Sequence, residues 1–224
     1  ILHFSIMKEV IMKKLLFWMV LIVGIVVLLG SCAKKDESTT AASTSVTSTT
    51  ASGSITVGSE TLSGTYVSTC NTTEFAANAG ISIFPADIKS GKTVMVVTSD
   101  TTFSDEMLMY TDTSCSTPTS YTKNGNTSVT VGVASGSYYL VTYGTSYFKV
   151  TAHTAVAQDN LTAGLIGNMS DIDLTTLGKE FSDTGSSSTY KNVWSVTSTT
   201  YQQGEEQDNG TQPTAMDSMV MTKE

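Results

Sequence analysis

The chain has 224 residues and a formal net charge of −8, and all 12 of its basic residues are lysine. Sites for nucleic acid and phosphate depend on arginine forks and basic patches. An acidic chain without arginine therefore argues against a nucleic-acid partner and against docking on anionic lipid through a basic face.

An apolar segment with a charged start lies near the beginning of the chain. Lys13 and Lys14 precede an apolar run from Leu15 to Leu29, which is the order of a secretory signal. The exit Leu29-Gly30-Ser31-Cys32 resembles the lipobox of bacterial lipoproteins. The resemblance implies cleavage before Cys32 and acylation of its thiol and its new amino group. We therefore interpret residues 1–31 as an over-extended N-terminus followed by a lipoprotein signal peptide.

The alternative is an uncleaved membrane anchor, but a run of about 15 residues is shorter than the roughly 20 that a spanning helix needs. We expect translation to start at Met12 or Met7. Two or more acyl chains hold a protein firmly to a membrane, so we expect a lipid-anchored protein of the cell envelope. Ala33 follows Cys32, in place of the aspartate that retains lipoproteins at the inner membrane. This favours the outer membrane in a diderm cell and leaves open which side of it the protein faces.

A segment rich in serine and threonine follows the predicted anchor. From Ser38 to Ser54 it contains no aromatic residue and one valine, Val46. Such a segment cannot bury enough apolar surface to offset the entropy of ordering it. We therefore expect residues 32–54 to form the lipid anchor and a flexible linker, although the composition also allows a glycosylated stalk.

Residues 55–224 carry the pattern of a β-domain. Glycine, tyrosine, serine and threonine are abundant, which favours strands and turns over helices. Short apolar stretches separated by turn signals recur about every 8–12 residues, the spacing of a sandwich or barrel. We predict an all-β fold, an antiparallel lipocalin-like barrel of about 8–10 strands with one short helix.

Three local expectations follow from the same pattern. Lys123-Asn124-Gly125-Asn126 is a hairpin turn signal. Asp159 to Ile166 is interpreted as a strand. Ser170 to Leu177 begins with a serine and two aspartates, as a short helix would.

Cys70 and Cys115 are the two cysteines that remain once Cys32 is acylated. In an oxidising compartment their pairing would close a loop of about 45 residues, worth roughly 4 kcal/mol in the chain-entropy model. The alternative is two free thiols. A redox pair is disfavoured because there is no Cys-x-x-Cys spacing.

No motif of enzymatic chemistry is present. His153 is the one histidine of the predicted mature chain, and we expect it on the solvated face of a strand, where it cannot form a zinc site alone. There is no Gly-x-Ser-x-Gly elbow for a serine nucleophile. Paired carboxylates occur at Asp105-Glu106, Asp171/Asp173 and Glu205–Asp208. The last run lies in a loop with glycine and asparagine, where a solvated acidic loop is favoured over a weak calcium site because no EF-hand spacing is present. We predict no enzymatic activity, no cofactor and no metal.

Several aromatic side chains are candidates either for the lining of an apolar ligand cavity or for the core of a closed sheet. They are Tyr110, Tyr138, Tyr139, Tyr143, Tyr147, Phe148 and Trp194. We expect most of them to belong to the core.

Three stretches carry a resemblance to a known group of proteins: Gly64–Cys70, Tyr110–Pro118 and Pro213–Asp217. In this order they resemble uncharacterised bacterial lipoproteins with a small lipocalin-like barrel. That group shows Gly-x-Trp/Tyr-x-Ser-x-Cys, then Tyr-Ser/Thr-Asp-x-x-Cys, then Pro-Thr-x-x-Asp. The resemblance covers most of residues 60–224. It implies the barrel and the Cys70–Cys115 pairing, and it brings no known ligand.

Two functions remain open at this point. The first is a lipid-anchored envelope protein whose barrel binds a small apolar ligand or a protein partner that the sequence does not identify. The second is a structural or surface-display lipoprotein whose barrel is filled and has no ligand. A cavity lined by aromatic residues would favour the first, and a solidly packed barrel the second.

Overall fold

Eleven strands and two helices make up the residues that the computed structural model describes, which are 47–165, 174–184, 189–205 and 211–224. The strands are β1 (Ile55–Val57), β2 (Glu60–Leu62), β3 (Thr65–Ser68), β4 (Ser90–Val97), β5 (Phe103–Tyr110), β6 (Pro118–Ser135), β7 (Tyr138–Ala152), β8 (Glu180–Asp183), β9 (Thr189–Val196), β10 (Thr200–Gln203) and β11 (Met221–Lys223). The helices are α2 (Thr73–Ala77) and α3 (Ala155–Leu165). Neither helix has the length and hydropathy that crossing a membrane requires. The predicted signal peptide and Cys32 lie outside the described residues.

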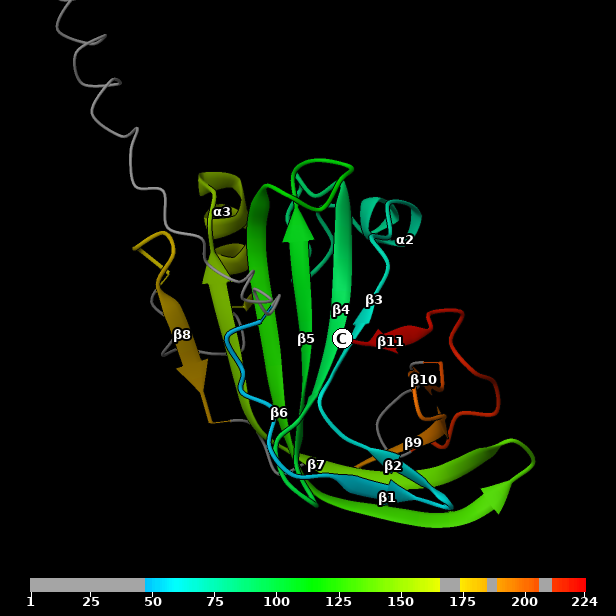
Figure 1. Ribbon diagram of the computed structural model, residues 1–224. Coiled ribbons are helices and arrows are strands. Elements are labelled where there is room, and N and C mark those ends of the chain that lie inside the picture. The colour runs from blue at the N-terminus through cyan, green and yellow to red at the C-terminus, as the bar shows by residue number, and fades with distance from the viewer. Residues whose placement is uncertain (1–46, 166–173, 185–188, 206–210) are drawn as a thin grey trace, which may run out of the picture. The chain divides into compact units, whose positions relative to one another are not determined.

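Eight strands close into an antiparallel barrel (Figure 1). The order around it is β6, β5, β4, β3, β11, β10, β9 and β7, and the pairing of β6 with β7 closes the ring. Strand β8 pairs with residues 148–151 of β7, beyond the segment 139–144 that pairs with β9. The predicted all-β antiparallel barrel is confirmed, with a strand count inside the expected range.

The longest hairpin of the barrel is β6 with β7, and it corrects a predicted turn. Lys123–Asn126 lies inside β6 and does not form a hairpin turn; the chain turns instead around Gly136. Gly125 serves the packing of the strand pair, because a Cβ there would lie 2.1 Å from the ring of Tyr147. The register shifts between Gly125 and Asn126, so the Asn-Gly signal marks a bulge.

The predicted strand at Asp159–Ile166 is also wrong, because most of it belongs to α3. The hydroxyl of Thr154 accepts a hydrogen bond from the backbone nitrogen of Ala157 (3.1 Å) and so caps the helix start. Ala157 and Leu161, four residues apart, are wholly buried against the barrel end. Residues 170–173 of the other predicted helix lie outside the described ranges, and residues 174–177 are not helical.

Apolar clusters occupy the two ends of the barrel. The first cluster includes Phe103 at the start of β5 and Val141 near the start of β7, and the β1–β2 hairpin packs into it. Figure 1 shows this hairpin lying across that end, inside the bend of β6 and β7. The second end holds Val150 of β7 and Met109 of β5, which belong to clusters that include α3 and α2. Between these ends, the inner face of the barrel also carries polar side chains, among them Asp105 and Asn124.

The compact unit begins at Thr47, ahead of the Ile55 predicted as the start of the domain. The backbone nitrogen of Ser52 donates to the carbonyl of Val97 (2.9 Å), and its hydroxyl donates to the carbonyl of Thr98 (2.7 Å). The last residues of the predicted linker are therefore hydrogen-bonded to the end of β4. They can be ordered without apolar side chains because hydroxyl and backbone groups supply the contacts.

Candidate functional site

Two adjacent carboxylates on β5 point to opposite faces of the barrel wall. Asp105 is the register partner of Met95, a wholly buried member of the first core cluster, so Asp105 faces the interior. Glu106 is the partner of Val94 on β4 and of Lys123 on β6, on the outer face. Because side chains alternate along a strand, the pair cannot act together on one substrate.

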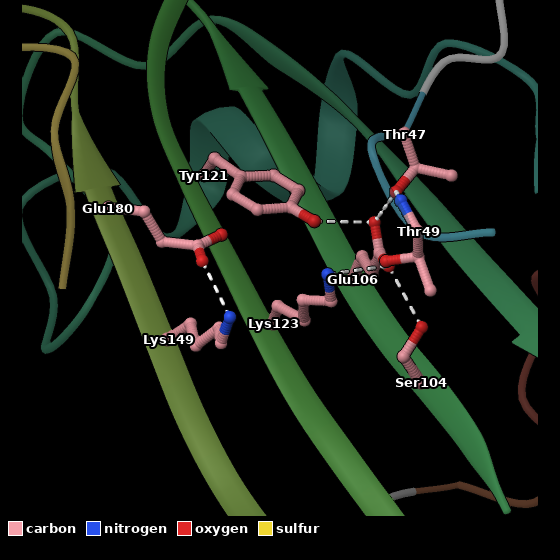
Figure 2. A network of polar contacts seen from close by, with 8 residues as sticks. All are labelled: Thr47, Thr49, Ser104, Glu106, Tyr121, Lys123, Lys149 and Glu180. Atoms are coloured by element: carbon pink, nitrogen blue, oxygen red, sulfur yellow. Dashed lines mark hydrogen bonds and ion pairs between the residues drawn. The ribbon is translucent and has the colours of Figure 1, made fainter. Parts of the chain in front are cut away.

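Figure 2 shows the outer carboxylate, Glu106, at the centre of a polar network. Its side chain is fully buried. Four hydroxyl groups donate to it: Thr47, Thr49, Ser104 (2.8 Å) and Tyr121 (2.6 Å). Lys123 Nζ lies 3.8 Å from Oε1 and is itself almost fully buried. Burial, together with the Glu106 carboxylate, raises the pKa of Tyr121 well above its usual range.

This outer network has a structural role. A carboxylate offers about four lone-pair positions, and the donors around Glu106 occupy them. No lone pair is left for a proton transfer to a substrate. Two of the donors come from the segment that precedes β1, so the network fastens this segment to the wall formed by β5 and β6. A second polar pair, Lys149–Glu180 (2.7 Å), joins β7 to β8 nearby (Figure 2).

The inner carboxylate, Asp105, is only half satisfied. Asn126 Nδ2 donates to Asp105 Oδ2 (3.1 Å), while Oδ1 is buried and has no hydrogen-bond partner among the described residues. Burial raises the pKa of Asp105 to about 7, and the negative charge of Glu106 adds to the effect. An interior carboxyl group that titrates near neutral pH is unusual for a position with a purely structural role.

An aromatic layer, which we call the aromatic floor, lies next to Asp105 at the first end of the barrel. Its rings are Tyr66, Phe103, Tyr143, Trp194 and Tyr201. Trp194 is wholly buried and packs edge-on against Phe103 (5.2 Å between ring centroids) and Tyr201 (5.5 Å). Burial raises the pKa of Tyr201, and the charge of Asp105 raises it further. The buried Nε1 of Trp194 lies close enough to the Tyr201 hydroxyl to lower the pKa of that group slightly.

Beyond the aromatic floor the interior face includes polar side chains. One row of register partners crosses the wall from Asp105 to Asn124 and Phe148, and Met107 follows Asp105 on the same face. All four residues, here called the inner belt, face inward and are partly accessible. Phe148 and Met107 also pack against the clusters at the second end. An eight-stranded barrel is wide enough to be filled by its own side chains or to hold one small ligand.

The charges of the wall are separated by face. Four lysines lie on the outer face: Lys92, Lys123, Lys149 and Lys191. Lys223 is exposed at the first end of the barrel, where Nζ donates to the hydroxyl of Ser63 (3.0 Å). Among the described residues, no cation lies within salt-bridge distance of Asp105. The interior carboxyl group therefore has no partner of opposite sign within the described residues.

The predicted disulfide is confirmed. Cys70 and Cys115 are bonded, with 5.9 Å between their Cα atoms, and they join the end of β3 to the turn between β5 and β6. In that turn the Asp112 carboxylate accepts hydrogen bonds from the chain on either side of Cys115, from Ser114 (2.7 Å to its hydroxyl) and from Ser116 (3.0 Å to its hydroxyl). Hydrogen bonds from Ser114 and Thr117 hold the pKa of Asp112 well below its usual range.

Two groups of predicted residues remain, His153 and the other paired carboxylates. His153 is exposed between β7 and α3. The Asp171/Asp173 pair and most of the Glu205–Asp208 run lie outside the described residues. Within the described ranges, no group of three or more His, Cys, Asp or Glu side chains could hold a metal ion.

The aromatic candidates are split between the two faces of the wall. Trp194, Tyr143 and Tyr139 pack in or against the first core cluster, as the core interpretation predicts. Tyr147 lies on the outer face against Gly125. Phe148 packs against the cluster at the second end of the barrel, which includes Val150. The sequence analysis named Asp105 only as one of a pair of acidic residues; its place in an alternating strand, two residues after the apolar Phe103, is the signal that could have identified it as inward-facing.

Comparison with protein-family models and with curated proteins finds no match to this chain.

Proposed function

We propose that this chain is a lipid-anchored protein of the cell envelope whose barrel holds one small ligand. The anchoring part of the proposal rests on the sequence Leu29-Gly30-Ser31-Cys32 after an apolar run. The ligand-binding part rests on the inner belt, where inward-facing side chains keep accessible surface between two apolar barrel ends. Phe148 and Met107, which are partly accessible, supply apolar surface for such a ligand.

The supporting observation is the combination of partly accessible inward-facing side chains with an unused hydrogen-bonding group. Buried polar groups in folded proteins are almost always paired. Among the described residues, Asp105 Oδ1 has no hydrogen-bond partner and belongs to the barrel interior. A ligand that reaches this carboxyl group would account for its position. It would also bury the accessible surface of the inner belt.

The second candidate is a structural or display protein with a filled barrel. It is favoured by the aromatic floor, where Tyr66, Phe103, Trp194 and Tyr201 are all wholly or almost wholly buried and the rings are in contact. The floor closes only one end of the barrel, and the inner belt is not part of it. We therefore place ligand binding first.

Native mass spectrometry of the mature protein, isolated from membranes in a mild detergent that is removed in the spectrometer, tests this proposal. We expect a subpopulation with one bound small molecule at 1:1 stoichiometry. A matched variant, Asn124→Phe, fills the inner belt with a ring and should lose the bound mass while keeping the fold. A single unliganded mass for wild type, with no change on adding hydrophobic small molecules, would favour the filled structural barrel.

A further inference from the structure

The longest hairpin of the barrel leaves part of one strand without a neighbour on its outer side. Strand β6 pairs with β5 as far as Asn126. From there to its end at Ser135, β7 is the one strand that pairs with it among the described residues. The backbone nitrogen of Val129 still donates to the carbonyl of Thr101 (3.0 Å). Residues 130–135, which we call the free edge, therefore have backbone groups on one side that are available to another strand. Figure 1 shows this end of the hairpin reaching past β1 and β2.

The free edge lacks two features with which proteins usually protect such a strand. Exposed edges commonly carry charged side chains or proline, which prevent pairing with another chain. No charged residue and no proline occurs between Lys123 and Lys149. Val133 is 73% exposed, more than any other large apolar side chain in the described ranges. Together with Thr130 and Val131 it is β-branched, which favours the extended conformation. Such an edge is suited to binding by the addition of a strand.

The charge of the chain indicates which strand this is. Two copies of a protein with a net charge of −8 repel each other over most of their surface. Two free edges can pair without this penalty, since no antiparallel register sets like charges opposite each other. The other edge of the nine-stranded sheet is β8, where antiparallel pairing with a second copy would set Glu180 opposite Asp183. A second copy of this chain is therefore compatible with the free edge and incompatible with β8.

We propose that two copies of this chain form a dimer by pairing their free edges antiparallel about a two-fold axis. Both copies contribute the same residues, so the pairing occupies both edges and the assembly is closed. The pairing is also short, because β6 changes register between Thr127 and Thr130 and between Val131 and Ala134, and the chain turns at Gly136. A ladder of this length buries little surface, and we therefore expect a reversible dimer. This inference does not depend on the proposed ligand.

Sedimentation velocity of the mature protein in a mild detergent, over a range of protein concentrations, tests the proposal. We expect a dimer whose share increases with concentration. Val133→Lys sets two like charges close together across the axis and should weaken dimerisation about tenfold or more. Val220→Lys adds the same charge at another exposed valine, outside the hairpin, and should leave the dimer unchanged. Val133→Glu alone should also be monomeric, and mixing it with Val133→Lys should restore the dimer through opposite charges.

Disulfide trapping in intact membranes locates the contact. Cys70 and Cys115 are bonded to each other, and the proposed acylation occupies Cys32, so the mature protein offers no free thiol. Ala134→Cys, an exposed position of the free edge, should give a covalent dimer on oxidation with copper phenanthroline. Ser182→Cys, an exposed position of β8, is the matched control and should remain monomeric, as should wild type.

Three results would overturn the proposal. The first is a wild type that is monomeric at every concentration, which would leave the free edge to a strand of another protein. The second is a Val133→Lys variant that dimerises as strongly as wild type, because the contact would then lie elsewhere. The third is a mixture of the Lys and Glu variants that stays monomeric, because the loss would then not arise from contact between copies. Native mass spectrometry for a bound small molecule tests the proposed ligand separately.

Discussion

Replacing Asp105 by asparagine should stabilise the protein at alkaline pH. The substitution keeps the shape of the side chain and leaves an amide oxygen to accept the hydrogen bond of Asn126. It removes a carboxyl group whose pKa rises from 3.8 to about 7 on folding, mainly because the group is buried. Since one pKa unit corresponds to about 1.4 kcal/mol, the ionised carboxylate costs the folded state up to about 4 kcal/mol.

The pH dependence follows from the direction of this shift. Below pH 3.8 the group is protonated in both the folded and the unfolded chain, and it costs nothing. Between pH 3.8 and 7 the unfolded chain has released the proton while the folded chain still holds it, so stability falls as the pH rises. Above pH 7 the cost is constant. The advantage of Asp105→Asn over wild type should therefore grow by about 2–3 kcal/mol between pH 5 and pH 8.

Urea unfolding monitored by Trp194 fluorescence measures this difference directly, because the m-value and midpoint at each pH give the free energy of unfolding. Asp100→Asn, which removes the same charge from an exposed position, is the matched control and should show no growing advantage. A variant that is no more stable than wild type at pH 8, or an advantage that does not change with pH, would show that Asp105 is solvated or already neutralised.

Three further predictions concern the ends of the domain and its cross-link. Cys32→Ala should abolish labelling by radioactive palmitate and release the protein from the outer-membrane fraction; undiminished labelling would contradict the proposed anchor. Cys70→Ser opens a cross-link between residues 45 apart, and a loss of about 3 kcal/mol should lower the melting temperature by about 6–12 °C without unfolding the barrel. The double variant Thr47→Ala/Thr49→Ala should destabilise the protein by about 2–4 kcal/mol and expose the segment before β1 to protease, because each hydroxyl bonds a buried carboxylate. Thr50→Ala, at an exposed position between that segment and β1, is its control and should behave as wild type in both assays.

The barrel itself could be predicted from the sequence because the apolar residues of its strands form a recognisable pattern along the chain. Val94 to Val97 is a continuous apolar run, and all four side chains are buried on one face or the other. The errors arose where a local signal had two meanings. Asn124-Gly125 is a frequent turn sequence, but here the missing side chain of Gly125 makes room for Tyr147 on the neighbouring strand. A requirement imposed by a residue more than 20 positions away cannot be read from a window around the turn.

The segment from Asp159 onward illustrates a different limit. Its apolar residues are too sparse to show a clear period, and α3 has only a weak amphipathic pattern. The helix is stabilised by the cap from Thr154 and by the burial of Ala157 and Leu161 against the barrel end. Both depend on tertiary contacts that form after the barrel closes.

The pair Asp105-Glu106 shows why the candidate site could be predicted only in part. Strand alternation predicts that the two carboxylates face opposite ways, and in an ordinary barrel wall the outer one would be solvated. Glu106 is instead buried, because Thr47 and Thr49 lie over it and donate hydrogen bonds to it. The serine and threonine residues that predicted an unstructured linker also carry hydroxyl groups that can donate hydrogen bonds. Glu106 on the barrel accepts two of these bonds, from Thr47 and Thr49. Once Glu106 is saturated in this way, Asp105 on the inner face of β5 is left as the carboxyl group of this pair with an unused oxygen among the described residues.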